Sequence, residues 1–166
     1  MPAFTISKKI FITFFLIAMG TAFFFSCLNS YDRTKFSQEQ TIHHYKGSEE
    51  NQGYGEGFSY PMSYSEVIEV MHVHAFLIPL VIFVMSRILS MTGTGEGVKV
   101  TVYVSAFIGT IMNLSGPYLI IYSSETFTIS LIASYIILGL CFIAFISLPI
   151  GKMWSRKPAE ESDYWL

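Results

Sequence analysis

The stretch that decides the fold is "EVIEVMHVHAFLIPLVIFVMSRIL", which runs from Glu66 to Leu89. Its apolar part is as long as the roughly 20 residues that a helix needs to cross the hydrocarbon of a bilayer. Because no water is available there, the backbone must satisfy its own hydrogen bonds, and a run of this length predicts a membrane helix rather than a strand. The stretch also carries His72 and His74 near its start, and membrane insertion does not require either of them.

Three further apolar runs of similar length, 10–28, 100–122 and 127–150, contain no formal charge. The chain of 166 residues is 52% hydrophobic and only 13% charged, about half the charged fraction of a soluble domain. The connections "TGTGEG" and "SSE" are short, and short connections make neighbouring helices antiparallel. We therefore expect an all-α integral membrane protein, a single domain over 1–166 formed by an antiparallel four-helix bundle, with helices at about 9–28, 65–91, 98–122 and 126–152.

The distribution of lysine and arginine predicts the orientation of this bundle, since cytoplasmic segments carry the excess of positive charge. We expect both termini in the cytoplasm, an outer loop over about 29–64 and a cytoplasmic tail over 153–166. The location predicted is the inner (cytoplasmic) membrane of a bacterium. The inner segments would hold Lys8, Lys9, Arg87, Lys99, Lys152, Arg156 and Lys157, and the outer loop Arg33, Lys35 and Lys46.

Composition excludes several classes of function. A net charge of -2 provides no basic stripe for nucleic acid. The two cysteines, Cys27 and Cys141, fall toward opposite sides of the bilayer on this topology, so a disulfide between them is not expected. The inner half of the predicted bundle carries no carboxylate or lysine, which disfavours a pump or a channel.

The polar residues of the predicted helices gather in one leaflet. Residues two apart on a helix project about 200° from each other, so only one of His72 and His74 can point into the bundle. Asn113 reaches the same leaflet on the third helix, and Pro117 frees its backbone carbonyl. The alternative is that both histidines are interfacial residues that are hydrogen-bonded to the outer loop.

Glycines 109 and 116 share one face of the third predicted helix, because they lie seven residues apart. Such a spacing permits close approach of either a neighbouring helix or a flat cofactor. Close helix packing is the commoner use of small residues in membranes, and we expect it here.

Histidine inside a helical bundle indicates a metal or a haem, because neutral imidazole is a common ligand for iron, copper and zinc. His72 and His74 are the candidate metal ligands, and haem b or a quinone is the candidate cofactor. The other predicted helices contain no histidine, so a second haem ligand would come from a methionine, the loop or a partner chain. A single zinc or copper ion held by His72, a loop histidine and Glu69 is the rival. The candidate residues around the cofactor are His72, His74, Met112, Met19, Asn113, His43 and His44.

The segment "MHVHAFLIPLVIF", from Met71 to Phe83, resembles the histidine-bearing helix of membrane cytochromes and of haem-copper oxidase relatives. The chain is similar in this respect to small four-helix cytochrome b-type subunits of electron-transfer complexes. The resemblance implies a redox membrane subunit that works in the lipid bilayer with other membrane subunits of a larger complex.

The leading hypothesis is therefore a membrane subunit of an electron-transfer complex with a haem b or quinone pocket in the outer leaflet, centred on His72 or His74. We expect an electron-carrying or non-catalytic subunit rather than a free-standing enzyme. Two alternatives stay open: an accessory, scaffolding subunit of a larger complex, and a protein that binds metal at its outer surface.

Overall fold

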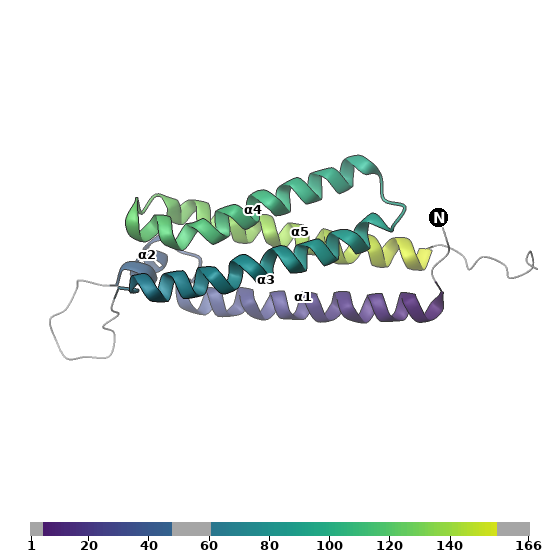
Figure 1. Ribbon diagram of the computed structural model, residues 1–166, viewed down its shortest axis with the longest axis horizontal. Helices are drawn as coiled ribbons and strands as arrows, with labels where there is room; N and C mark the ends of the chain where they lie inside the picture. The colour runs from purple at the N-terminus through teal and green to yellow at the C-terminus, as the bar shows by residue number, and fades with distance from the viewer. Residues whose placement is uncertain (1–4, 48–60, 156–166) are drawn as a thin grey trace, which may run out of the picture.

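The computed structural model describes residues 5–47 and 61–155, and within these ranges it contains five helices and no strand. Four of the helices are long and apolar enough to cross a membrane, so the chain is a multi-pass integral membrane protein. The expected all-α membrane bundle is confirmed. The helices are α1 (Ile6–Thr34), α2 (Gln38–Lys46), α3 (Tyr64–Ser90), α4 (Glu96–Tyr122) and α5 (Phe127–Ser155) (Figure 1).

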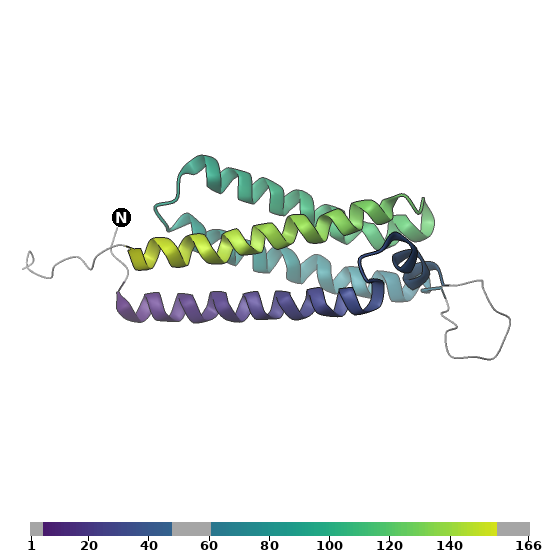
Figure 2. The same ribbon diagram turned by 180° about the vertical axis from the view of Figure 1, so that it is seen from behind.

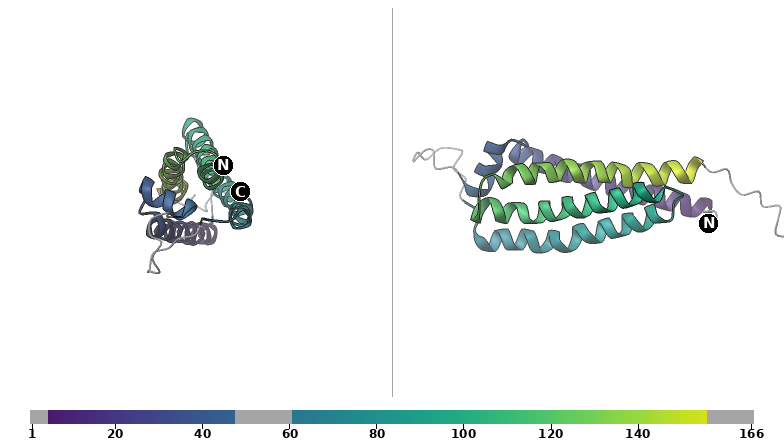
Figure 3. Two further views of the ribbon diagram at one scale, coloured as in Figure 1. Left: turned by 90° about the vertical axis from the view of Figure 1, so that its left-hand side faces the viewer. Right: turned by 90° about the horizontal axis from the view of Figure 1, so that it is seen from above.

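The four long helices lie side by side with alternating direction, as both side views show (Figures 1 and 2). Helix α4 packs most closely on α5, α3 packs on α4, and α1 packs on α5. Seen along the bundle axis, the short helix α2 lies across one end (Figure 3). We call this the α2 end; α1 and α4 finish there, and α3 and α5 begin there.

Local capping signals set the helix boundaries near the α2 end. The Ser63 side chain accepts a hydrogen bond from the Glu66 N–H, while the Ser63 N–H donates to the Glu66 carboxylate, which is a capping box at the start of α3. Helix α2 begins after Ser37, whose side chain accepts from the Gln40 N–H at 3.2 Å. It ends at Gly47, whose φ of 76° suits glycine.

Three expected boundaries need correction. Helix α1 continues to Thr34 instead of ending at about residue 28, and α2 lies inside the segment 29–64 that was expected to be a loop. Helix α5 runs to Ser155, so the tail expected over 153–166 begins with helix. For α1 and α5, the reason is that an apolar run marks the hydrocarbon, whereas helical hydrogen bonds continue into the interface wherever polar side chains tolerate them. Helix α2 instead depends on contacts with α1, α4 and α5.

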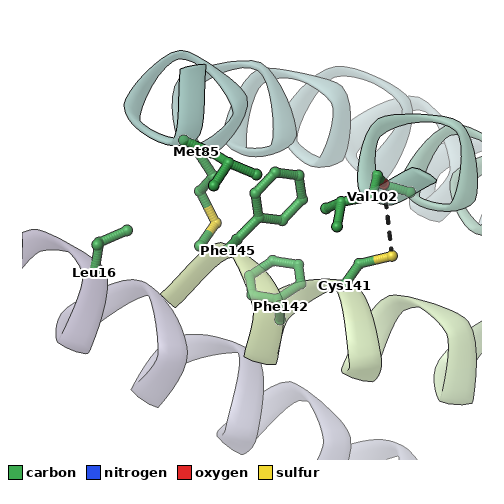
Figure 4. Packing of buried hydrophobic residues seen from close by; sticks show 8 residues of the cluster. Leu16, Met85, Val102, Cys141, Phe142 and Phe145 are labelled. Carbon is green, nitrogen blue, oxygen red and sulfur yellow. Dashed lines mark hydrogen bonds between the residues drawn. The ribbon is translucent and has the colours of Figure 1, made fainter. Parts of the chain in front are cut away.

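A cluster of buried apolar residues lies in the half of the bundle away from the α2 end. Leu16, Met85 and Phe145 come from three different helices and are completely buried (Figure 4). The rings of Phe23 and Phe142 stack with their centroids 4.1 Å apart, which fixes α1 against α5. In lipid, such contacts stabilise the bundle through packing rather than through the hydrophobic effect.

Close packing of α4 on α5 depends on the two glycines of α4. A Cβ added at Gly116 would lie 2.8 Å from Leu131 Cδ1, and one at Gly109 would lie 3.0 Å from Ile137 Cγ2. Both distances are shorter than ordinary van der Waals contact between carbons. The prediction that these glycines serve helix packing is confirmed.

Candidate functional site

His74 is held in one defined orientation by its own helix. Its Nδ1 lies 2.7 Å from the carbonyl oxygen of Val70, one turn earlier on α3. A carbonyl only accepts hydrogen bonds, so Nδ1 carries the proton and donates it. In the neutral ring this leaves Nε2 with a lone pair, available as a hydrogen-bond acceptor or as a metal ligand.

Two adjoining cavities meet at His74. The first, which we call the mouth cavity, has a volume of about 150 Å³ and lies under α2. The second, the central cavity, has a volume of about 280 Å³ and extends along α1 and α3 toward the middle of the bundle. Both cavities are lined by the same four polar residues, Ser30, His74, Asn113 and Tyr135, each from a different long helix.

His72 does not share this position. It is exposed and lines neither cavity, as expected for a residue two positions from His74 on the same helix. Glu69, one turn before His72, is exposed as well. Both histidines of α3 are exposed, but of these two only His74 lines the cavities.

Asn113 is oriented by a buried serine of α5. The Asn113 amide nitrogen donates to Ser134 Oγ at 3.1 Å, and the Ser134 hydroxyl donates to the Leu131 carbonyl at 2.6 Å. Ser134 is completely buried, so this pair has little freedom to reorganise. Pro117, which lacks an N–H for the Asn113 carbonyl, lines the mouth cavity beside it.

Tyr135 connects α5 to α1 at the boundary of the two cavities. Its hydroxyl lies 3.4 Å from the Ser30 hydroxyl, which donates to it. Its ring packs on Phe36, with centroids 5.5 Å apart. Tyr135 and His74 therefore line the same two cavities.

Helix α2 contributes polar groups to the mouth cavity. His44 and Tyr45 line it together with Arg33 of α1. Burial is the main cause that raises the pKa of Tyr45 above its usual range, so this phenol stays protonated and remains a donor at neutral pH. Burial, and then the nearby Arg33 guanidinium, lower the pKa of His44, which favours its neutral form.

An ion pair holds α2 over the bundle. Lys46 Nζ lies 3.0 Å from Glu125 Oε1, in the connection between α4 and α5, and both side chains are partly exposed. An exposed pair of this kind contributes at most about 1 kcal/mol. It nevertheless fixes which part of the bundle α2 covers.

The other predicted site residues separate into two groups. Met19 lines the central cavity and His44 lines the mouth cavity. Met112 lines neither cavity, and His43 is exposed and lines neither. Within residues 5–47 and 61–155, no group of three or more His, Cys, Asp or Glu side chains could hold a metal ion.

Sequence reasoning did not select Ser30 or Tyr45 as site residues. Ser26 and Ser30 are four residues apart on α1, and both line the central cavity. This spacing puts them on one helix face, which was a readable signal. Tyr45 could be found only once the segment 38–46 was identified as a helix.

The comparisons with known proteins indicate a family but not an activity. No curated protein matches the chain, and no solved structure matches it. A family model described as a transmembrane helical domain matches residues 35–160, which include α2 to α5 and His74. Because the match covers more than half of the sequence, the chain belongs to this family, the Aq_1264_TM transmembrane helical domains.

Proposed function

We propose that the chain is a membrane subunit of an electron-transfer complex and that its central cavity binds the ring of a quinone beside His74. The observation that carries the proposal is the hydrogen bond from His74 Nδ1 to the Val70 carbonyl. It leaves Nε2 as an acceptor at a cavity where other donors converge.

The polar groups fit both forms of such a ring. A quinone carbonyl accepts hydrogen bonds, and the Asn113 amide and the Tyr135 hydroxyl are donors that line the same cavity. A quinol hydroxyl donates, and His74 Nε2 accepts. When bound, a quinone would supply electron and proton transfer, whereas the protein groups bind and orient the ring.

The shape of the central cavity also fits a lipid-soluble ring. Its volume of about 280 Å³ is near the lower end of ordinary ligand sites, which suits one ring rather than a macrocycle. Helices α1 and α3 pack mainly on α5 and α4 rather than on each other. Exposed residues of both, such as Ala22 and Leu77, line the cavity, so it opens between these helices toward the lipid.

A second candidate, haem b, is favoured by one observation. Met19 lines the same cavity as His74, and histidine–methionine ligation is ordinary for cytochromes. Arg33, which lines the adjoining mouth cavity, is a basic group of the kind that pairs with propionates. Haem is the second choice because the volume of the central cavity, about 280 Å³, suits a single ring better than a macrocycle.

The orientation follows from the charge distribution. We infer that the α2 end faces the outside and that both termini lie in the cytoplasm, since the opposite end carries Lys8, Lys9, Arg87 and Lys152. Electrons exchanged with the ring would pass to a partner subunit of the same complex.

Equilibrium binding of a short-chain quinol, the form whose hydroxyl donates to His74 Nε2, to the purified chain in mild detergent tests the proposal. His74→Leu removes the acceptor, and His72→Leu, two residues away on the outward face, is the matched control. Loss of one hydrogen bond of about 1.4 kcal/mol predicts about a tenfold weaker affinity for His74→Leu and no change for the control.

Two results would overturn the quinone assignment. The first is equal quinol affinity in the His74→Leu and His72→Leu variants. The second is a Soret band in the purified protein that disappears in both His74→Leu and Met19→Leu, which would transfer the site to haem.

A further inference from the structure

The structure points to a further function for the mouth cavity: we propose that it is a water-filled path through which His74 exchanges protons with the α2 end of the bundle and with no other side. That water reaches His74 from the α2 end is inferred from the geometry of the cavities alone. That this path carries protons to or from a bound quinone ring rests on the proposed function.

The mouth cavity has the size and the lining that ordered water requires. At about 30 Å³ per molecule, its volume of about 150 Å³ holds roughly five waters. A buried water needs two to four polar partners. The walls supply such partners from Asn29, Ser30, Arg33, Tyr45 and Asn113 among others.

The cavity reaches solvent at one end and His74 at the other. Arg33 and Asn29 line it and are exposed, at the point where α1 finishes. His74 lines both this cavity and the central one. Water that enters beside Arg33 therefore meets the imidazole at the site where the ring would bind.

The opposite half of the bundle contains a tightly packed apolar cluster. Leu16, Met85, Leu89, Ala106 and Phe145 are completely buried and pack in one cluster across all four long helices. The cluster also contains Cys141, whose thiol is directed at the Val102 carbonyl at 3.8 Å (Figure 4). No side chain of this cluster is a proton carrier at neutral pH.

The titratable groups that face His74 come from three helices. Helix α1 contributes Cys27 to the central cavity and Arg33 to the mouth cavity. Helix α2 contributes His44 and Tyr45, and α5 contributes Tyr135. Helix α4 contributes Asn113, which does not titrate. Burial, and then Arg33, lower the pKa of His44, which favours its neutral ring.

The exchange balances in atoms and in charge. His74 Nε2 would accept one proton from a ligand hydroxyl, which leaves the ligand as an anion, and the imidazole would become an imidazolium whose Nδ1–H still donates to the Val70 carbonyl. The Nε2 proton would then pass to a water of the mouth cavity, and the imidazole would return to its neutral form. The net result would be transfer of one proton from the ligand to water at the α2 end, with the negative charge left on the ligand until its electrons pass to the partner subunit.

The test measures the rate at which single cysteines react with a membrane-impermeant thiol reagent, applied to either side of proteoliposomes. The first probe is a single cysteine at position 30, in a chain that combines Ser30→Cys with Cys27→Ala and Cys141→Ala. It reports on the wall that the two cavities share. The native Cys141, kept alone by Cys27→Ala, is the matched control in the closed core. Asp32→Cys in the cysteine-free chain reports which compartment the α2 end faces, because the Asp32 side chain is 86% exposed there.

We expect the cysteine at position 30 to react at least about tenfold faster from the α2 end than from the other side, and Cys141 to be unreactive from both. Native Cys27, kept alone by Cys141→Ala, provides a second probe should the Ser30→Cys chain not fold. Absence of reaction from the α2 end for both probes, or equal rates from both sides, would overturn the path.

Added quinone separates this inference from the proposed function. If Cys27 reacts from the α2 end and added quinone slows this reaction, both the water path and the quinone assignment are supported. Reaction from the α2 end that quinone leaves unchanged keeps the water path and removes the quinone assignment. Protection by quinone together with reaction from the opposite side keeps the ligand and removes the path.

Discussion

Substitution of Gly116 by alanine tests the packing of α4 on α5. The added Cβ would lie 2.8 Å from Leu131 Cδ1 and 3.1 Å from Leu131 Cβ. Leu131 is only 1% exposed, so its side chain has little room to move aside. Overpacking of a filled interior costs about 1–3 kcal/mol.

The intrinsic helix preference acts in the opposite direction, since alanine is favoured over glycine by about 1 kcal/mol within a helix. Gly139→Ala on α5 is the control that carries this preference without the clash, because nothing lies within 4 Å of a Cβ built at Gly139. The free energy of unfolding of Gly116→Ala should therefore fall below that of Gly139→Ala by about 1–3 kcal/mol.

The measurement is denaturant unfolding in mixed micelles, followed by helical circular dichroism, for the wild-type chain and both variants under one set of conditions. Equal free energies of unfolding for the two variants, within about 0.5 kcal/mol, would refute the close approach of α4 and α5.

Three further predictions concern the α2 end. The pKa of His44 lies below the value of about 6.5 expected when α2 is detached, so the detached state binds the proton first as the pH falls. The docking of α2 should therefore weaken below about pH 6.5, which is measured as faster amide exchange in α2 after correction for the intrinsic exchange rate. The same pH response in His44→Gln as in the wild-type chain would contradict this. Ser134→Ala leaves the Asn113 amide without its partner, and we expect a loss of about 1–3 kcal/mol in the free energy of unfolding; a neutral substitution would show that this pair does not orient Asn113. Lys46→Ala should make amide exchange in α2 faster at low salt, because the free energy of opening of α2 falls by less than about 1 kcal/mol. The difference from the wild-type chain should shrink at high salt, which screens the ion pair. A difference that salt leaves unchanged would show that the ion pair with Glu125 is not its cause.

The membrane bundle could be predicted from the sequence because hydropathy reports the hydrocarbon directly. The four apolar runs correspond to α1, α3, α4 and α5. What hydropathy does not report is where helical hydrogen bonding stops, and α1 therefore extends to Thr34 through residues that are polar but still helical.

Helix α2 was missed although local signals for it exist. Ser37 and Gln40 have the spacing of a capping box, and Gly47 follows the last helical residue. The segment between them, "QEQTIHHYK", is polar and has no apolar stripe long enough to predict a helix. Its stability comes from contacts with α1, α4 and α5, which the sequence does not show.

The site could be predicted only in part. Helical geometry required one of the two histidines to point away from the other, but it could not decide which one faces the bundle. That choice depends on how α3 is rotated against α4, and the structure places His74 at the cavities. Asn113 was anticipated from its leaflet, whereas the convergence of Ser30 and Tyr135 depends on the order of the helices around the axis.

Photoaffinity labelling with an azidoquinone, followed by peptide mapping, tests the central claim most directly. We predict label on the faces of α1 and α3 that line the central cavity, around Cys27 and Ile78. With the reagent kept in its reduced form, whose hydroxyl donates to His74 Nε2, this label should be lost in His74→Leu but not in His72→Leu. Label spread over lipid-facing residues such as Phe14 and Phe83, with no dependence on His74, would contradict it.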